Sequence, residues 1–322
     1  MLHIIKDMVK LSNWAKLIKN PSKFKKVFNE RINYYPGLKF GYTKNKKIKK
    51  LYINFNTFFA KKNNQFDKIF YQHEKESNNT DINFYVDSKF EFNKEHFESL
   101  KKNGILVLKN ILPKNEYNEI CNKFDKVKKN ELNLASGEYY QNLTGKSEDT
   151  KSTNIGIDVS SYENLIKISN QITEEVYGKS IDPSAYIMYT KSINLPDRPC
   201  NGDNVWHTDR YLPNLKLIYF PFKVDEDSAP FRYSLGSHKI DGNYLDFFIN
   251  QDEGNLEKEE DEKKFLKNPK ELTVEQNTLV VALTNGFHGR KAFNKKKDRS
   301  ALFLCYPNFN LLSLISFWRY NS

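Results

Sequence analysis

The middle of the chain has a helical pattern of apolar positions. Apolar side chains recur every three to four residues, the spacing that places them on one face of a helix. Asn93 is a typical N-cap residue, and Asn103-Gly104 is typical of the left-handed turn that ends a helix. The apolar run 105–108 predicts a short buried strand. The pattern predicts helices over residues 94–102, 113–128 and 161–178.

After Pro183 the pattern changes to short runs rich in β-branched and aromatic residues, bounded by Pro, Gly, Asn and Asp. Such runs are typical of strands in a β-sandwich or barrel. Residues 241–270 interrupt the series with a mostly charged middle, and are predicted to form an inserted loop and helix at the rim. The expected fold is therefore mainly β with flanking helices. The predicted strands cover residues 184–192, 215–224, 231–235, 272–274, 278–283 and 300–306.

The N-terminal quarter differs from the rest in charge. Residues 1–80 contain 18 Lys and Arg against 5 Asp and Glu, a net charge of +13, so the remainder of the +11 chain carries −2. Residues 1–30 have an amphipathic, basic helical pattern, which suits either packing on the protein itself or contact with an anionic membrane surface. We therefore predict a basic, partly helical extension over 1–80 and one domain over 81–322.

The bulk composition fits a folded protein of the cytoplasm. Hydrophobic residues make up 39% of 322, and no apolar run reaches the roughly 18 residues of a membrane span. The N-terminus lacks the pattern of a secretory signal. Three cysteines without close spacing do not form a disulfide framework. The sequence has no helix-turn-helix, zinc-finger or aromatic RNA-binding motif, so nucleic acid is not an expected partner.

Two of the six histidines lie in surroundings that suit a metal site. In an extended segment, side chains two residues apart point to the same side, so His207 and Asp209 can converge on one ion. His288 follows the predicted strand 278–283 and completes the set if its strand lies beside the first. Two imidazoles and one carboxylate are the ligand set of non-haem Fe(II) oxygenases. An HxD tripeptide also occurs in ordinary surface turns.

Arg299 adds a second feature to this set. It lies 11 residues after His288 and begins the predicted strand 300–306. A guanidinium group at this place can form a bidentate pair with the distal carboxylate of a dicarboxylic acid. The alternative is an ordinary salt bridge at a strand end.

Four stretches, in this order and spacing, resemble the phytanoyl-CoA hydroxylase-like branch of the Fe(II)/2-oxoglutarate-dependent oxygenases. Together they span residues 92–306, and residues 1–80 show no such likeness. The stretches are FNKEHFESLKKNGILVLKNILPKNEYNEI (92–120), VWHTDR (205–210), SAPFRYSLGSHK (228–239) and NGFHGRKAFNKKKDRSALFLCY (285–306).

The resemblance implies a double-stranded β-helix, the cupin-like jelly roll, with helices packed on one side. It implies His207, Asp209 and His288 as the iron ligands and Arg299 as the anchor of 2-oxoglutarate, with no catalytic residue beyond the ligands. His238 then belongs to the Gly236-Ser237-His238 segment, the GSH loop, and is not a ligand. The expected cofactors are Fe(II) and the cosubstrates 2-oxoglutarate and O2.

The expected activity is that of a dioxygenase that hydroxylates an unactivated C–H bond of a small organic molecule, with succinate and CO2 as co-products. Ala229 and Leu235 depart from the family's Gly and Pro in the GSH loop. The carboxylate at Asp209 matters more, because related halogenases have a small residue there, so hydroxylation is favoured.

Three further residues are candidates for the wall of the substrate pocket. Trp206 adjoins the first ligand, while Tyr189 and Lys191 lie on the strand before it. The competing functional hypothesis is a cupin-like metal-binding isomerase or binding protein that does not use 2-oxoglutarate.

Overall fold

The computed structural model describes residues 46, 50, 54, 67–72, 81–86, 90–128, 139–144, 150–192, 205–209, 214–250, 255–256 and 258–306. The amphipathic pattern predicted over residues 1–30 lies outside the described residues, as does most of the basic extension. Residues 67–72 are the longest described part of that extension. They form a π-helical turn, η3 (Asp67–Tyr71), whose Ile69 and Phe70 are buried in the core.

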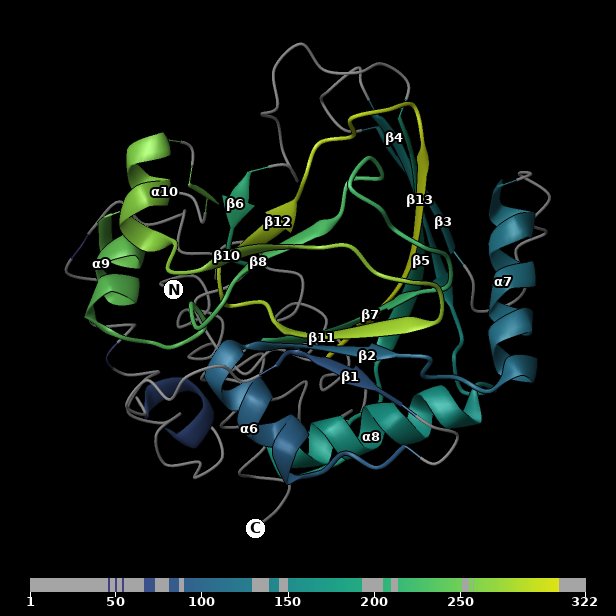
Figure 1. Cartoon of the computed structure of the whole chain (residues 1–322), viewed down its shortest axis with the longest axis horizontal. Coiled ribbons are helices and arrows are strands. Elements are labelled where there is room, and N and C mark those ends of the chain that lie inside the picture. Colours follow the sequence, from purple (N-terminus) through teal and green to yellow (C-terminus); the bar gives the residue numbers. More distant parts are fainter. Residues whose placement is uncertain are drawn as a thin grey trace, which may run out of the picture.

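The described chain forms two β-sheets with helices around them (Figure 1). The large sheet has the order β1 (Asn83–Tyr85), β2 (Ile105–Lys109), β11 (Thr278–Leu283), β7 (Leu215–Phe220), β13 (Asp298–Cys305), β5 (Ser184–Ser192), β4 (Thr150–Ile157) and β3 (Tyr139–Thr144). The small sheet has the order β10 (Pro269–Leu272), β8 (Phe231–Ser234), β12 (His288–Arg290), β6 (Trp206–His207) and β9 (Asn255–Leu256).

The path of the chain between the sheets defines a double-stranded β-helix. From β5 onward the chain alternates between the sheets: β5 and β7 lie in the large sheet and β6 lies in the small one. Strands β8 and β10 then pair in the small sheet. The alternation resumes with β11 in the large sheet, β12 in the small sheet and β13 in the large sheet. All pairs among these strands are antiparallel. This winding is that of a jelly roll, so the predicted fold class is confirmed.

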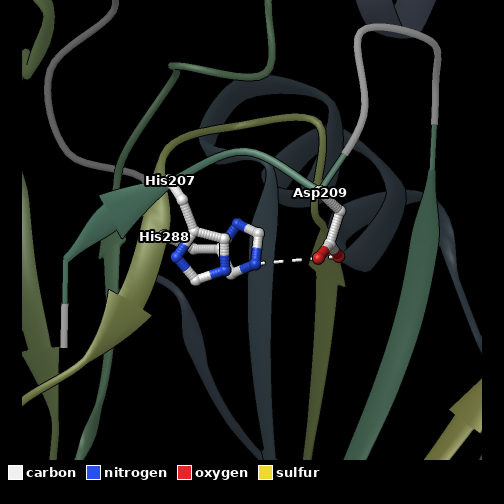
Figure 2. A group of neighbouring side chains, drawn as sticks. All are labelled: His207, Asp209 and His288. Atoms are coloured by element: carbon white, nitrogen blue, oxygen red, sulfur yellow. Dashed lines mark ion pairs between the residues drawn. The ribbon is translucent and has the colours of Figure 1, made fainter. Parts of the chain in front are cut away.

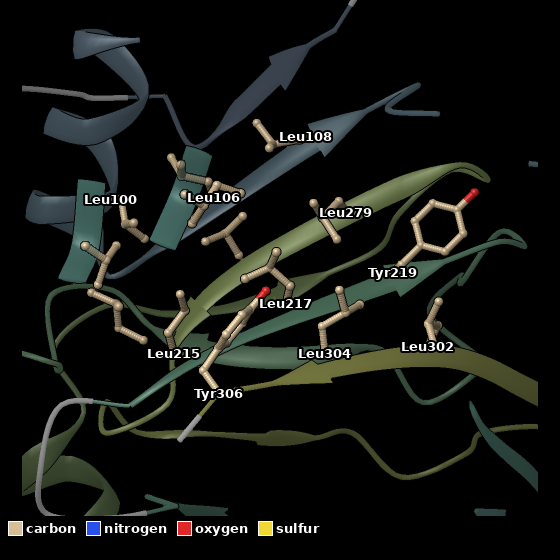
Figure 3. Packing of buried hydrophobic residues seen from close by; sticks show 14 of the residues in the cluster. Leu100, Leu106, Leu108, Leu215, Leu217, Tyr219, Leu279, Leu302, Leu304 and Tyr306 are labelled. Carbon is tan, nitrogen blue, oxygen red and sulfur yellow. The ribbon is translucent and has the colours of Figure 1, made fainter. Parts of the chain in front are cut away.

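Alternating side chains of the strands separate an interior from an outer face. The interior between the two sheets is filled by a cluster that includes Ile218, Phe220, Phe231, Tyr233, Val280, Ala301 and Phe303. The intervening residues of the large sheet, Leu217, Tyr219, Leu279, Leu302 and Leu304 among them, form the outer cluster shown in Figure 3. Every second residue of a strand therefore faces the interior, and the residues between them face outward.

Helices cover the outer face of the large sheet (Figure 1). They are α6 (Lys94–Asn103), α7 (Lys114–Lys128) and α8 (Glu163–Tyr177), close to the predicted bounds. Asn93 caps α6 through a reciprocal pair of hydrogen bonds with His96, and Gly104 ends it at φ 78°, as predicted. The carboxylate of Glu116 on α7 accepts hydrogen bonds from the backbone amides of Asn164 and Leu165, and so caps α8 from a neighbouring helix.

The segment between β8 and β10 contains α9 (Gly242–Asn250), β9 and α10 (Glu259–Phe265). It lies beside β6 in Figure 1 and buries Phe247 and Phe265 against Phe287. No helix among the described residues is both long and apolar enough to cross a bilayer.

Several strand predictions differ from the structure. The strand predicted over 272–274 is instead β10, which ends at Leu272, and Val274 forms only an isolated bridge with Val224. Strands β1, β3 and β4 were not predicted. Each extends an edge of the large sheet, where pairing with a neighbour rather than a distinct apolar period determines the strand.

Gly104 is expected to be more sensitive to substitution than another helix-ending glycine, Gly178. Both have positive φ, 78° and 75°, but a Cβ at Gly104 would lie 2.4 Å from His238 Nδ1 and from Tyr233 Oη, whereas nothing lies within 4 Å at Gly178. We expect Gly178→Ala to cost about 1 kcal/mol of left-handed strain. We expect Gly104→Ala to cost about 2–5 kcal/mol, because overpacking is added to that strain. Urea unfolding of the two variants measures this, and equal losses would contradict the packing described here.

Candidate metal centre

Three side chains from two strands and a loop converge at one end of the small sheet (Figure 2). His207 ends β6, Asp209 follows two residues later, and His288 begins β12. Because β12 pairs with β6 with His288 directly opposite His207, the two imidazoles share a face of the sheet. One ligand atom from each of the three residues lies within 4.8 Å of the other two. The structure thus brings together the three residues predicted as ligands.

Each imidazole is oriented by the backbone carbonyl of the residue two positions before it in the chain. His207 Nδ1 lies 2.9 Å from the carbonyl oxygen of Val205, and His288 Nδ1 lies 2.9 Å from that of Gly286. A carbonyl oxygen only accepts, so each Nδ1 carries a proton and Nε2 is the ring atom of each histidine that can bind a metal. Backbone contacts of this kind fix the tautomer and ring direction of metal-binding histidines.

The site keeps His207 in the form that binds metals. Burial lowers the pKa of the His207 imidazole to about 4, and the neighbouring His288 contributes in the same direction. The imidazole is therefore neutral at pH 7.

Asp209 is held by the loop that joins β11 to β12. Its backbone N–H donates to the carbonyl of Thr284 at 3.0 Å, and Thr284 N–H donates to the carbonyl of Asn214 at 2.7 Å. Asn214 Nδ2 also donates to Thr284 Oγ1 at 2.6 Å. Asp209 is thereby tied to the same loop that positions His288, so one loop places both side chains.

The carboxylate of Asp209 is ionised. Burial alone would raise its pKa, but the ion pair with Lys216 and the proximity of His288 outweigh burial and hold the pKa well below its usual range. Lys216 Nζ lies 2.6 Å from Asp209 Oδ2, and His288 Nε2 lies 3.7 Å from the same oxygen.

The GSH loop after β8 supports the turn before His288. Ser237 Oγ accepts the backbone N–H of Phe287 at 2.8 Å, and Asn285 Nδ2 donates to the carbonyl of His238 at 2.8 Å. The His238 ring is fully buried, and its Nε2 lies 3.0 Å from the carbonyl oxygen of Lys101. His238 is not among the three converging side chains.

Arg299 lies near the start of β13 and faces the barrel interior. It stands opposite Thr190 of β5, is 3% exposed, and places its guanidinium 5.2 Å from the centre of the Phe220 ring. Arg290 of β12 also faces the interior, because it stands opposite Phe231 of the interior cluster. Two buried guanidinium groups therefore project toward the same interior as the three converging side chains.

The three residues expected to wall the pocket do not face this interior. Trp206 points away from His207, packs with Leu256 on the outer face, and lies under the Arg232 guanidinium at 4.5 Å. Tyr189 packs in the outer cluster and donates to Asp298 Oδ2 at 2.6 Å, and Lys191 is exposed on the same side of β5. The alternation of side chains along a strand explains all three placements. The interior-facing neighbours on β5 are Tyr186 and Met188.

Lys216 was not anticipated from the sequence. The signal was present, because Lys216 is the only charged residue in the apolar strand LKLIYF, and a lone charge in a buried strand needs a partner. Its partner, Asp209, lies only seven residues earlier.

The geometry defines a class of site: two imidazoles and a carboxylate on one face, within a jelly roll. Nitrogen donors from two His and one carboxylate oxygen suit a divalent first-row metal. The three side chains come from one face, which leaves the opposite side of an ion open to small ligands.

Comparisons with known proteins give distant structural similarities. The sequence matches no protein-family model, and it matches no curated protein at a significant level. Similar solved structures include the epimerase SnoN in complex with Fe3+, α-ketoglutarate and nogalamycin RO, with 12% identity, TM-score 0.47, and coverage of 66% of this chain and 81% of that one.

Two further structures have similar values. HygX from Streptomyces hygroscopicus, with nickel, 2-oxoglutarate and hygromycin B bound, is 15% identical with TM-score 0.42, over 67% of this chain and 87% of that one. A Pseudomonas putida prolyl-4-hydroxylase is 12% identical with TM-score 0.40, over 66% and 97%. At these identities and TM-scores, the reactions of these proteins are not assigned to this chain, because one fold hosts many activities.

Replacing His288 by Ala should abolish tight metal binding, because one of three donors is lost. We expect the affinity for Co(II), followed by its visible absorption, to fall by roughly 100-fold or more. Loss of a residue that only supports a metal ligand lowers affinity by up to about 100-fold, and loss of a ligand should cost at least as much. His96→Gln is the matched control, since it also removes an imidazole but keeps a side chain suited to the third position of the α6 cap. Undiminished Co(II) binding by the His288 variant would refute the site.

Proposed function

We propose that this protein is an Fe(II)- and 2-oxoglutarate-dependent oxygenase that hydroxylates a C–H bond of a small organic substrate. The observation that carries the proposal is the convergence of His207, Asp209 and His288 inside a jelly roll with Arg299 facing the same interior. His207, Asp209 and His288 would hold the iron. The four resembling sequence stretches favour the phytanoyl-CoA hydroxylase-like branch.

The donor set fits this metal. Two neutral nitrogen donors and one carboxylate are the ligands of non-haem Fe(II) sites with open positions. The tautomers fixed by Val205 and Gly286 leave both Nε2 lone pairs available. The low pKa of the Asp209 carboxyl keeps the third donor ionised at neutral pH.

The interior also fits a dicarboxylate cosubstrate. A guanidinium binds a carboxylate through two parallel hydrogen bonds, and burial strengthens such a pair. Arg299 is buried and faces the interior, so we assign it to the distal carboxylate of 2-oxoglutarate. Arg290, which is 8% exposed and faces the interior from the small sheet, adds positive potential for an anionic ligand.

When bound, iron and 2-oxoglutarate supply the oxidation: the cosubstrate loses CO2 to become succinate, and one atom of O2 enters the substrate C–H bond. The protein orients the reactants and excludes water. The apolar interior cluster around Phe231 and Phe303 provides the dry surroundings, and Phe231 lies 5.7 Å from the His288 ring. Asp209 supplies the third ligand where a halogenase leaves room for a halide, which favours hydroxylation.

The test is formation of succinate from 2-oxoglutarate that requires Fe(II) and O2. Arg299→Met keeps much of the side-chain length but removes the charge. We expect its KM for 2-oxoglutarate to rise roughly 30-fold or more, because truncating one partner of a buried charge pair costs at least about 2 kcal/mol. Lys223→Met, which removes an exposed cation paired with Glu275, is the control and should leave KM unchanged.

A cupin-like isomerase or binding protein would give a different result. It would release no succinate under any condition, and the Arg299 variant would behave as the parent protein does. Substrates are then found as small molecules that raise succinate release above the uncoupled rate and that gain one oxygen atom by mass spectrometry.

A further inference from the structure

Lys216 is a cation inside the barrel that the proposed reaction does not use. It lies on β7, where it alternates with Leu215 and Leu217 of the outer cluster and shares the interior face with Ile218 and Phe220. Its neighbours across the sheet are Ala282 and Cys305. Burying an ammonium group among such residues is costly unless a counter-charge is close.

Asp209 is that counter-charge, and the contact is made through an oxygen that also faces the metal ligands. Lys216 Nζ lies 2.6 Å from Asp209 Oδ2, and His288 Nε2 lies 3.7 Å from the same atom. The side chains of the pair are 23% and 20% exposed, so water screens them only in part. An ion held by His207, Asp209 and His288 would therefore lie close to the ammonium of Lys216.

Lys216 has opposite electrostatic effects on the binding of a metal ion and on the binding of 2-oxoglutarate. Before binding, the charges of Asp209 and Lys216 sum to zero, and a metal-bound imidazole adds no charge to the sum. A divalent ion alone brings this group to +2, so Lys216 opposes it both by repulsion and by competing for Asp209. A chelating 2-oxoglutarate dianion then returns the sum to zero, so Lys216 favours it. Without Lys216 the corresponding sums are −1, +1 and −1.

We propose that Lys216 couples metal binding to binding of the dianionic cosubstrate: it weakens the hold on the bare ion and strengthens the hold on the ion with 2-oxoglutarate. The proposal rests on the proposed function and adds to it an electrostatic link between the two binding events. Coupling free energies are reciprocal, so the ion must raise the affinity for 2-oxoglutarate by the same factor by which 2-oxoglutarate raises the affinity for the ion.

The experiment measures the Kd for Mn(II) on the full chain, by the electron paramagnetic resonance signal of the free ion, with and without saturating 2-oxoglutarate. In the parent protein, 2-oxoglutarate should tighten Mn(II) binding by more than about tenfold, within the usual range of coupling factors. Lys216→Met should bind Mn(II) alone about tenfold more tightly and show a smaller enhancement than the parent, because only the enhancement that comes from chelation of the ion remains. Lys216→Arg, which keeps the charge, should retain it.

Other outcomes overturn the proposal. One is an enhancement of Mn(II) binding by 2-oxoglutarate below about threefold in the parent protein, a result that can be obtained without any variant. The other is an enhancement that is the same in Lys216→Met as in the parent. Weaker Mn(II) binding by Lys216→Met with an unchanged enhancement would show that Lys216 only orients Asp209. Lys216→Gln provides a second neutral variant, and circular dichroism checks the folding of each.

Failure of the proposed function gives a different pattern. If Mn(II) does not bind, or if His288→Ala binds it as the parent does, the metal site is wrong and both proposals fall. If Mn(II) binds through His288 and 2-oxoglutarate tightens it equally in all Lys216 variants, the proposed function stands and only the role of Lys216 is refuted.

Discussion

The bridge between β6 and β12 is the contact on which the site depends. It sets His288 opposite His207 although 80 residues separate them in the chain. A shift of this register by one residue would turn His288 to the other face of the sheet and leave two ligands without a third. The surroundings hold the register: β8 pairs with the other edge of β12, and the turn before His288 is bonded to the GSH loop.

The same fold reconciles an apolar interior with concentrated charge. Most interior residues are apolar, yet Asp209, Lys216, Arg290 and Arg299 are there too. Asp209 and Lys216 form an ion pair, and the two guanidinium groups lie on β12 of the small sheet and β13 of the large sheet. An interior with these cations suits anionic ligands better than neutral ones, in agreement with the proposed metal and dicarboxylate.

The parts of the site that follow a local period were predictable from sequence. His207 and Asp209 are two residues apart in an extended segment, and Asn93 and Gly104 are recognisable helix-ending residues. His288 and Arg299 were candidates from their places beside predicted strands, and the resemblance implied their roles, because no local pattern spans the distance from the first pair. Trp206, Tyr189 and Lys191 lie on the outer side of their strands, a placement that proximity in sequence does not reveal. Strands β3 and β4 were missed because their pairing partners, not their own composition, define them.

Pulsed electron paramagnetic resonance of the Mn(II)-loaded protein measures whether two imidazoles from these strands bind one ion. Binding by both His207 and His288 should give modulation from two inequivalent imidazole nitrogens, reduced to one in the His207→Ala variant. Modulation from one nitrogen or none in the parent protein, or no change on removing His207, would contradict it.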